Sequence, residues 1–413
     1  RAELMCSGFE VVDDIQDADL AVVNSCTVTH HAEAKIRQLL RGMLRVNPQI
    51  RILVTGCLAQ QDPRAVKEQL GVHWVVGNSR KDEIPSLLKK EGGGIVHEPL
   101  SAARLLGVSR RIPDPLSGGR TRFSVKIQEG CNYSCAYCIV PSVRGPSRWV
   151  SQSNVRLVID EARAKGFKEV VLTGTHIGQY GGKTGGLSGL LRDIVADQGD
   201  FRVRLSSLDP RDLTDDLLEV IAESPRVCDH LHVSVQSLCD RVLRAMGRGQ
   251  VGSVSLLDTI KQLRRARPHL MVGADLIVGF PGETSEMFEE TLTNVNAGEF
   301  GYGHVFRFSR RPGTRAHTMP DQVTEAEKSR RSILLRQLLK HNRYRFLQSL
   351  VGTRQRLIVE EENPVAGLTS NYVRVTVPQS SAKRNSWLEC EIVAPQSESE
   401  RSGPECSGRV ITS

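Results

Sequence analysis

Apolar runs alternate with amphipathic segments over the first 90 residues of the chain. The continuous apolar runs predict strands at 19–26, 50–57 and 73–77. The segments with helical spacing of apolar residues predict helices at 32–47, 62–70 and 82–90. Strands without polar alternation are typical of a parallel sheet whose two faces are covered by helices. We therefore expect a doubly wound α/β domain over residues 1–95 and a Gly- and Pro-rich linker over 96–120.

A strand-then-helix unit repeats through the middle of the chain. The predicted strands are 124–128, 169–175, 201–207, 230–236, 271–279 and 303–309. Amphipathic helices are predicted between them, at 154–166, 213–224 and 254–266. Six strands indicate an open (β/α)6 barrel, fewer than the eight that close a full one. Residues 121–346 would hold this barrel and a basic helix that follows it.

Small and polar residues gather where these barrel strands end. They are Gly174, Thr175, His176, Ser206, Ser207, Gln236 and Gly279, and Cys131 follows the first strand. The ends of parallel barrel strands share one rim, so we expect these separate segments to converge on one pocket.

The chain ends in a basic helix and a β-rich tail. Between residues 310 and 356 there are twelve Lys or Arg against three Asp or Glu. Short strands are predicted at 356–361, 372–377 and 388–393. A solvated helix face would explain a single run of charge. Continuation of the charge into a small β-barrel over 350–413, together with a net charge of +8, favours binding to an RNA backbone.

Composition narrows the class of protein. With 39% hydrophobic and 25% charged residues, the 413-residue chain is typical of a globular protein of two or three domains. No apolar run is long enough for a membrane span. Ten cysteines, partly clustered in one run, indicate metal binding in a reducing compartment such as the cytoplasm. The chain begins without Met, and we expect residues upstream of it.

The cysteine run is CNYSCAYC, from Cys131 to Cys138. A structural zinc site normally has four ligands, whereas three thiolates can hold three irons of a cube and leave the fourth open. A zinc knuckle or a purely structural cluster is the alternative that the spacing alone leaves open. With an aromatic residue before its last cysteine, the run resembles the CxxxCxxC signature of the radical S-adenosylmethionine (SAM) superfamily.

Further motifs along nearly the whole chain resemble those of the methylthiotransferase family. They are NSCTVT at 24–29, TGCLAQ at 55–60, CIVPSVRGPSR at 138–148, VLTGTHIG at 171–178, SSLDP at 206–210, HLHVSVQS at 230–237, DLIVGFPGET at 275–284, RPGT at 311–314 and GLTSNYVRVTV at 367–377. The resemblance implies an N-terminal cluster-binding domain, a radical SAM barrel and a C-terminal RNA-binding TRAM domain. Leu238, Cys239 and Trp149 depart from the residues usual in the family near the expected pocket.

Within that family, CTVT and the histidine of LTGTHIG resemble the branch that acts on N6-threonylcarbamoyladenosine in tRNA. The implied reaction gives the 2-methylthio derivative of this nucleoside next to the anticodon. The isopentenyl-adenosine branch and the branch that modifies an aspartate of ribosomal protein S12 are the alternatives within the family. A non-catalytic RNA-binding protein with a structural cluster is the alternative from another class.

The resemblance also implies roles for individual residues. The ligands of the radical cluster would be Cys131, Cys135 and Cys138, and no residue is assigned as acid or base. The implied SAM contacts are Tyr137, Gly174, Thr175, Ser207, Gln236, Gly279 and Gly282. At Gly279 and Gly282 a side chain would collide with the adenine of the cofactor.

A second [4Fe–4S] cluster is implied in the N-terminal domain. Its ligands would include Cys26 and Cys57, which follow neighbouring predicted strands, and we expect the third ligand upstream of this chain. Cys6 is instead predicted to be a buried free thiol in the first helix. The expected partners are tRNA, an electron donor such as a flavodoxin and a source of sulfur. No membrane partner is expected, and the chain should be a monomer.

Overall fold

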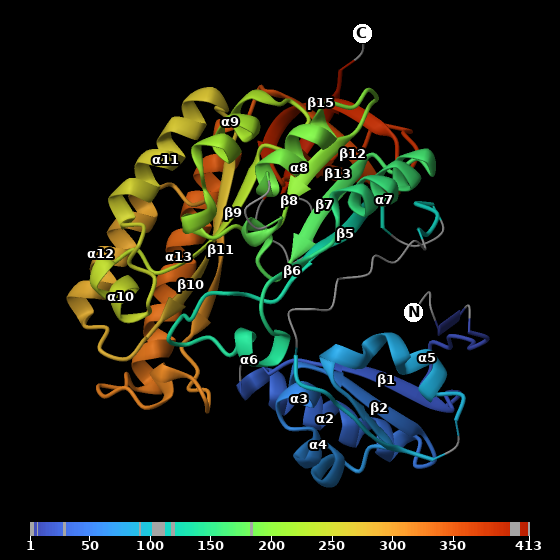
Figure 1. Ribbon diagram of the computed structural model, residues 1–413. Helices are drawn as coiled ribbons and strands as arrows, with labels where there is room; N and C mark the ends of the chain where they lie inside the picture. The colour runs from blue at the N-terminus through green and yellow to red at the C-terminus, as the bar shows by residue number, and fades with distance from the viewer. Residues whose placement is uncertain are drawn as a thin grey trace. The chain divides into compact units, whose positions relative to one another are not determined.

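The computed structural model describes residues 4–5, 7–27, 30–90, 92–100, 112–116, 120–181, 185–396 and 405–411. The chain divides into two compact units. One unit comprises residues 1–105, 129–148 and 309–318, and the other comprises 106–128, 149–308 and 319–413. The domain boundaries predicted from the sequence remain predictions. Helix and strand labels follow Figure 1.

The first unit is built on a parallel sheet with the strand order β1-β2-β3-β4. Its strands are β1 Leu20–Ser25, β2 Arg51–Gly56, β3 Trp74–Val76 and β4 Gly94–Val96. Its helices are α2 His30–Val46, α3 Cys57–Gln61, α4 Pro63–Leu70 and α5 Ile84–Leu87. The first three strands confirm the sequence prediction, whereas β4 lies where the linker was expected to begin.

Two hydrophobic clusters cover the two faces of this sheet. On one face Leu40 of α2 and Val66 of α4 pack with Ile52 and Val54 of β2. On the other face Leu53 of β2 packs with residues of α5 and β3. Successive side chains of a strand point to opposite faces, so a strand buried on both sides must be apolar throughout. This explains the continuous apolar run of β2.

The second unit contains the six predicted barrel strands. They are β5 Arg122–Glu129, β7 Glu169–Gly174, β8 Arg202–Leu205, β9 His230–Gln236, β10 Met271–Val278 and β11 Tyr302–Arg307. They form two parallel sheets, β6-β5-β7-β8 and β9-β10-β11, with the two-residue strand β6 Arg148–Trp149 at one edge. A parallel bridge between Leu208 and Val233 links the sheets. The sheets therefore form an open barrel, as the sequence predicts.

Helices cover the outer face of this barrel (Figure 1). They are α7 Gln152–Ala164, α8 Gly186–Val195, α9 Asp215–Glu223, α10 Asp240–Ala245, α11 Ser253–Ala266 and α12 Ser285–Ala297. The short helix α6 Val140–Arg144 belongs to the first unit. Hydroxyl side chains start several of these helices: Ser151, Thr214 and Thr284 each accept a backbone N–H of the first turn. Such caps satisfy N–H groups that lack a partner within the helix.

The long helix α13 Glu325–Ser349 leads into a small closed β-barrel. The barrel has the order β12-β13-β14-β16-β15, and its strands are β12 Arg354–Glu362, β13 Val365–Thr369, β14 Arg374–Thr376, β15 Trp387–Pro395 and β16 Cys406–Val410. Three of these were predicted from the sequence, and β13 and β16 were not. In the described part of the chain, no helix combines the length and apolarity needed to cross a membrane.

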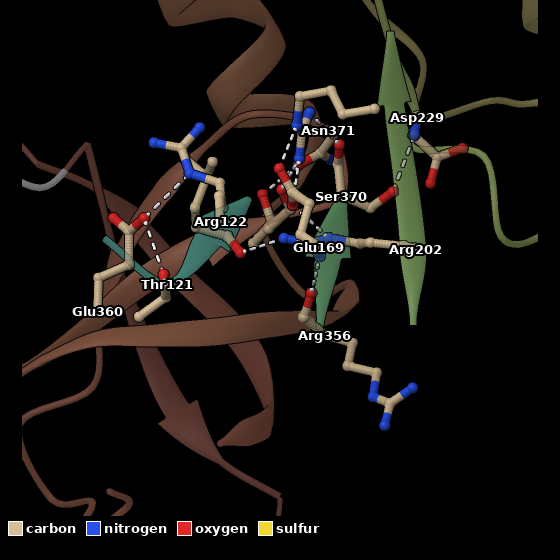
Figure 2. Close-up of polar contacts among 12 residues, drawn as sticks. Thr121, Arg122, Glu169, Arg202, Asp229, Arg356, Glu360, Ser370 and Asn371 are labelled. Atoms are coloured by element: carbon tan, nitrogen blue, oxygen red, sulfur yellow. Dashed lines mark hydrogen bonds and ion pairs between the residues drawn. The ribbon is translucent and has the colours of Figure 1, made fainter. Parts of the chain in front are cut away.

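A buried carboxylate joins the two barrels of the second unit (Figure 2). Glu169, at the start of β7, is fully buried and accepts hydrogen bonds from Arg202 Nε at 2.6 Å and Arg204 Nε at 2.7 Å. The same guanidinium groups donate to carbonyl oxygens of the C-terminal barrel, Arg202 to Leu368 at 2.8 Å and Arg204 to Thr369 at 3.1 Å. Every partner in this cluster is therefore hydrogen-bonded away from water.

The charge of Glu169 is held by its arginine partners. Burial opposes ionisation, but Arg204 and Arg202 outweigh it and hold the pKa of the Glu169 carboxyl well below its usual range. A carboxylate with a lowered pKa stabilises the fold above its usual pKa, and that contribution is lost as the pH falls toward the lowered value. The junction should therefore persist through neutral and mildly acidic pH.

Replacement of Glu169 by Gln should destabilise the second unit strongly. Two guanidinium groups would stay buried without their carboxylate, a change that typically costs about 3–5 kcal/mol in the free energy of unfolding. Urea denaturation measures this loss. Asp200→Asn is the matched control, because its pair with Arg356 is solvent-exposed and should contribute about 1 kcal/mol or less. Equal effects of the two substitutions would contradict the assignment.

Candidate functional site

The three cysteines of CNYSCAYC lie on a loop between β5 and α6 in the first unit. Gly130 precedes them with φ +82°, and an added Cβ there would strike the backbone of Gly145 and Pro146. The N–H of Cys131 donates to the carbonyl of Gly145 at 3.0 Å. Glycine at position 130 therefore allows the chain to turn sharply and close the loop on itself.

The loop presents its sulfur atoms to backbone N–H groups. Tyr133 N–H donates to Cys131 Sγ and Val140 N–H to Cys138 Sγ, each at 3.4 Å. The side chains of Cys131, Cys135 and Cys138 are all half-buried. Three thiols on one loop, two of them accepting backbone N–H groups, fit the ligand set of an iron–sulfur cluster, whose sulfurs are stabilised by such bonds. Tyr137 lies in the same loop and is half-buried.

Cys26 and Cys57 follow directly after paired residues of neighbouring strands. Ser25 at the end of β1 is in register with Gly56 at the end of β2. The prediction that the two cysteines follow adjacent strand ends is therefore confirmed. Cys26 is exposed and Cys57 is buried at the start of α3. Cys6 lies outside the described residues.

The sulfur of Cys57 contacts the segment that follows the cysteine loop. Arg144 Nε donates to Cys57 Sγ at 3.2 Å, and Asn78 Nδ2 lies 3.8 Å from the same sulfur. Arg144 is held in turn by Glu129, at 2.9 Å, while Asn78 donates to the carbonyl of Val143 at 2.7 Å. A single hydrogen-bond network thus connects a cysteine of the N-terminal sheet to the short helix after Cys138. No feature of the sequence indicates this contact.

The RPGT motif is anchored to the N-terminal sheet within the first unit. Arg311 is buried, pairs with Glu33 of α2 and donates to Thr27 Oγ1 at 2.6 Å. Two residues beyond the motif, Ala316 N–H donates to the carbonyl of Ala136 in the cysteine loop at 2.8 Å. The segment after β11 therefore contacts both regions that carry cysteines.

Most of the residues predicted to bind SAM lie at or just after strand ends in the second unit, whereas Tyr137 belongs to the first unit. Gly174 ends β7, Thr175 follows it, and both are exposed. Ser207 is exposed just after β8. Gln236 ends β9 with φ +71°, an uncommon conformation for a residue with a side chain. Strained backbone of this kind is concentrated at functional sites, which favours a role for this strand end.

The histidine of LTGTHIG is fixed by two partners. His176 Nε2 contacts the Asp212 carboxylate, and the His176 N–H donates to Gln128 Oε1 at 2.7 Å. Gln128 is fully buried near the end of β5. The turn after β7 is therefore tied to the end of β5 on one side and to the segment after β8 on the other.

Gly279 and Gly282 differ in what surrounds them. Both have positive φ, +72° and +78°. A Cβ on Gly279 would collide with the side chain of Lys328 in α13, whereas nothing lies within 4 Å of a Cβ on Gly282. The Gly279 N–H donates to the buried carboxylate of Glu283 at 2.5 Å, and Arg331 pairs with that carboxylate at 2.8 Å. Contacts within the protein are thus enough to require glycine at position 279, without any bound ligand.

The basic helix is less available to RNA than its sequence suggests. Arg331 is 3% exposed and bonded to Glu283, so it is not a surface contact. Arg343 pairs with Glu405 at 2.6 Å and Arg345 with Glu299 at 3.3 Å. Acidic residues from outside 310–356 therefore neutralise part of the charge excess counted in that segment.

The residues that depart from the family pattern have different surroundings. Leu238 and Cys239 are fully buried, and Leu238 belongs to the main hydrophobic core. Cys239 Sγ donates to Glu290 at 3.1 Å. Trp149 is 38% exposed. Of the three, only Trp149 offers a large exposed surface.

The fold and the cysteine loop define the class of protein. Residues 125–295 match the Radical SAM superfamily, and residues 1–77 match Uncharacterized protein family UPF0004. The fold is similar to that of the radical SAM methyltransferase TsrM from Kitasatospora setae, with a TM-score of 0.55 and 16% identity over 72% of this chain and 64% of that one. A [4Fe–4S] cluster and SAM are the cofactors of a radical SAM protein.

Curated relatives define the family within this class. The chain is 34% identical to threonylcarbamoyladenosine tRNA methylthiotransferase MtaB of Thermotoga maritima, over 90% of this chain and 84% of that protein. It is 35% identical to MtaB of Bacillus subtilis, over 89% and 84%. It is 33% identical to tRNA-2-methylthio-N(6)-dimethylallyladenosine synthase of Mannheimia succiniciproducens, over 86% and 76%. The chain belongs to the radical SAM tRNA methylthiotransferase family.

Substitution of Gly279 by Ala should destabilise the protein more than substitution of Gly282 by Ala. Both variants place a side chain at positive φ, which costs on the order of 1 kcal/mol or more. Only Gly279→Ala adds a collision, with Lys328. The comparison is made by urea denaturation without SAM. Equal stability of the two variants would show that the Lys328 side chain moves aside freely, leaving glycine at position 279 without a packing reason.

Proposed function

We propose that this enzyme converts N6-threonylcarbamoyladenosine next to the tRNA anticodon into its 2-methylthio derivative. The observation that carries the proposal is the similarity to two relatives named for this substrate, each matched over 84% of its length. Dimethylallyladenosine, named for the third relative at 33% identity, is the second candidate substrate. The two candidates differ in the group on N6, so the nucleoside that gains the methylthio group distinguishes them.

The radical cluster would be held by Cys131, Cys135 and Cys138. When bound, the cluster and SAM supply a carbon radical able to attack an unactivated C–H bond such as that at C2 of adenine. The loop contributes the backbone N–H groups of Tyr133 and Val140, which stabilise negative charge on the sulfurs. The task of the chain is to hold the thiolates in place and to keep water from the reacting groups.

The SAM contacts would come from the strand ends of the barrel. We infer that Gly174 and Thr175 face the methionine part of SAM, and that Ser207 and Gln236 offer polar groups to its ribose or carboxylate. On the family resemblance, Gly279 and Gly282 would let the backbone approach the adenine, and Tyr137 is proposed as a further SAM contact. The exposure of Gly174, Thr175, Ser207 and Gly282 supports this assignment, because those positions are open to a ligand.

The second cluster would use Cys26 and Cys57 as two of its ligands. Their positions after adjacent strand ends support shared ligation. Arg144 would then place a positive charge and an N–H on a cluster sulfur, since it already donates to Cys57 Sγ. Hydrogen bonds and net charge near the sulfurs set the reduction potential of such clusters.

The C-terminal β-barrel would bind tRNA, and a flavodoxin-like electron donor and a sulfur source would serve the reaction. Arg409 and Lys383 pair with Glu391 and Glu362, but their side chains are 68% and 83% exposed on this barrel, which supports the RNA role. Phosphate contacts of this kind position an RNA without reading its sequence. The nearby junction at Glu169 fixes the small barrel against the large one, so a tRNA bound there would have a defined orientation to the strand ends.

The substrate proposal is tested on tRNA isolated from cells that lack methylthiolation. The cluster-loaded chain receives this tRNA with SAM, a sulfide source and a reductant, and the nucleosides are analysed by mass spectrometry. We expect 2-methylthio-N6-threonylcarbamoyladenosine, and we expect none with Cys135→Ser, which should also lose about one cluster of iron per chain. A methylthio group on dimethylallyladenosine instead would contradict the proposed substrate.

Substitution of Arg144 by Met should make the second cluster harder to reduce. Without Arg144, Cys57 Sγ loses a positively charged hydrogen-bond donor, and this loss disfavours the reduced cluster, which carries more negative charge. The reduction potential of the second cluster should therefore fall by on the order of 60 mV, which is a tenfold change in a one-electron equilibrium. Redox titration followed by electron paramagnetic resonance measures the shift. Arg315→Met is the matched control, because Arg315 donates to a carbonyl of the cysteine loop and not to sulfur. An unchanged reduction potential in the Arg144→Met variant would show that Arg144 does not tune the second cluster.

A further inference from the structure

Three side chains with metal-binding groups lie together on adjacent strands of the large barrel. His232 on β9 is in register with Gly273 on β10, and Asp275 on β10 is in register with His304 on β11. The neighbours of His232 along β9, Leu231 and Val233, point into the core beneath the helices. Because successive residues of a strand alternate between faces, His232 points to the inner face of the barrel.

The distances between these groups suit a single ion. One imidazole nitrogen from each histidine and one carboxylate oxygen lie within 4.8 Å of one another. His232 Nε2 is 3.1 Å from Asp275 Oδ1, and the two imidazole rings are 5.4 Å apart. We propose that His232, Asp275 and His304 bind a first-row divalent transition-metal ion, separate from any iron–sulfur cluster. This site does not depend on the proposed tRNA reaction.

The types of donor narrow the choice of ion. Two imidazoles and one carboxylate suit Zn²⁺ or Fe²⁺, whereas Mg²⁺ and Ca²⁺ prefer a shell of oxygen atoms alone. Three protein ligands leave at least one coordination position open in a zinc site. His304 is exposed and Asp275 is partly exposed, so a small oxygen-bearing ligand can reach that position.

A half-buried tyrosine supports the proposed ligand His232. Tyr302 Oη lies 2.8 Å from His232 Nδ1 and 2.6 Å from His230 Nε2. Histidines that bind a metal through one nitrogen normally donate the N–H of the other, which fixes the ring. Here His232 would bind through Nε2 and donate from Nδ1 to Tyr302. Tyr302 would in turn donate its own proton to His230 Nε2.

The tyrosine is itself held rigidly. A Cβ on Gly273 would collide with the Tyr302 ring, so only glycine at this point of β10 leaves space for it. On its other side, Tyr372 of the small barrel stacks on His230 with ring centroids 4.6 Å apart, and on Tyr302 at 5.9 Å. The orientation of His232 is therefore fixed before any ion arrives, which lowers the entropic cost of binding one.

The competing explanation is a hydrogen-bonded chain without metal. In that case His232 Nε2–H donates to Asp275 and Tyr302 donates to His232 Nδ1, and both nitrogens of His232 are satisfied. That arrangement requires nothing from His304. The two explanations therefore differ at His304, which is exposed and can be replaced with little risk to the fold.

The test uses the cluster-loaded, full-length chain and Zn²⁺. Equilibrium dialysis against limiting zinc, followed by elemental analysis, should find one zinc ion per chain. Absorption at the zinc K-edge is unaffected by the iron of the clusters, and it should show nitrogen and oxygen ligands with imidazole scattering. Loss of the hydrogen-bond partner of a metal ligand weakens binding by roughly 10–100-fold. Tyr302→Phe removes such a partner, so zinc binding should weaken by a factor within this range. His304→Ala removes a ligand itself and should weaken zinc binding by more.

The matched control is His269→Ala, which removes an exposed histidine between α11 and β10 and should leave zinc affinity unchanged. Thermal unfolding of each variant shows that the fold is retained, and His304→Ala decides the question if Tyr302→Phe unfolds. Three results would overturn the proposal: no bound zinc, a sulfur shell at about 2.3 Å that places the ion on cysteines, or equal affinity of His304→Ala and the unsubstituted chain.

Discussion

The second unit depends on one buried carboxylate. Glu169 neutralises two arginines that would otherwise be too costly to bury, and those arginines use their remaining donors on the backbone of the small barrel. A carbonyl oxygen accepts such bonds only when the loop that carries it keeps one conformation. The charge cluster therefore fixes residues 368–370 as well as the two strands that bear the arginines. The junction therefore holds the small barrel in one orientation relative to the large barrel.

Much of the fold could be predicted because buried parallel strands have a simple sequence signature. Val171 and Val272 lie in apolar runs that no helix spacing explains, and both runs proved to be strands. Short strands gave weaker signals. β13, Val365–Thr369, includes Gly367, whose lack of a side chain allows close approach to Ile358. Such a glycine weakens strand propensity although the packing requires it.

The site could be predicted only where its residues are close in sequence. The cysteine loop carries its spacing within eight residues, and that spacing, with the aromatic residue before the last cysteine, resembles the radical SAM signature. Contacts between distant segments depend on strand register, which the sequence does not specify. Arg144 is one basic residue among many until the fold brings its Nε to Cys57. The same holds for Arg331, which looks like a surface charge in a basic helix but is buried against Glu283. Local charge counts therefore overestimate what a helix offers to RNA.

The cysteines and the strand-end residues are divided between the two units. Residues 129–148 and 309–318 are neighbours of barrel segments in the sequence, but they belong to the first unit, with the N-terminal sheet. Each is tied there by specific bonds, through Arg144 to Cys57 and through Arg311 to Glu33. Thiols that hold metal clusters must keep fixed separations, and a loop anchored only to a flexible neighbour could not ensure this. Because the cysteine loop and Cys57 share one hydrogen-bond network, the N-terminal sheet positions both sets of thiols.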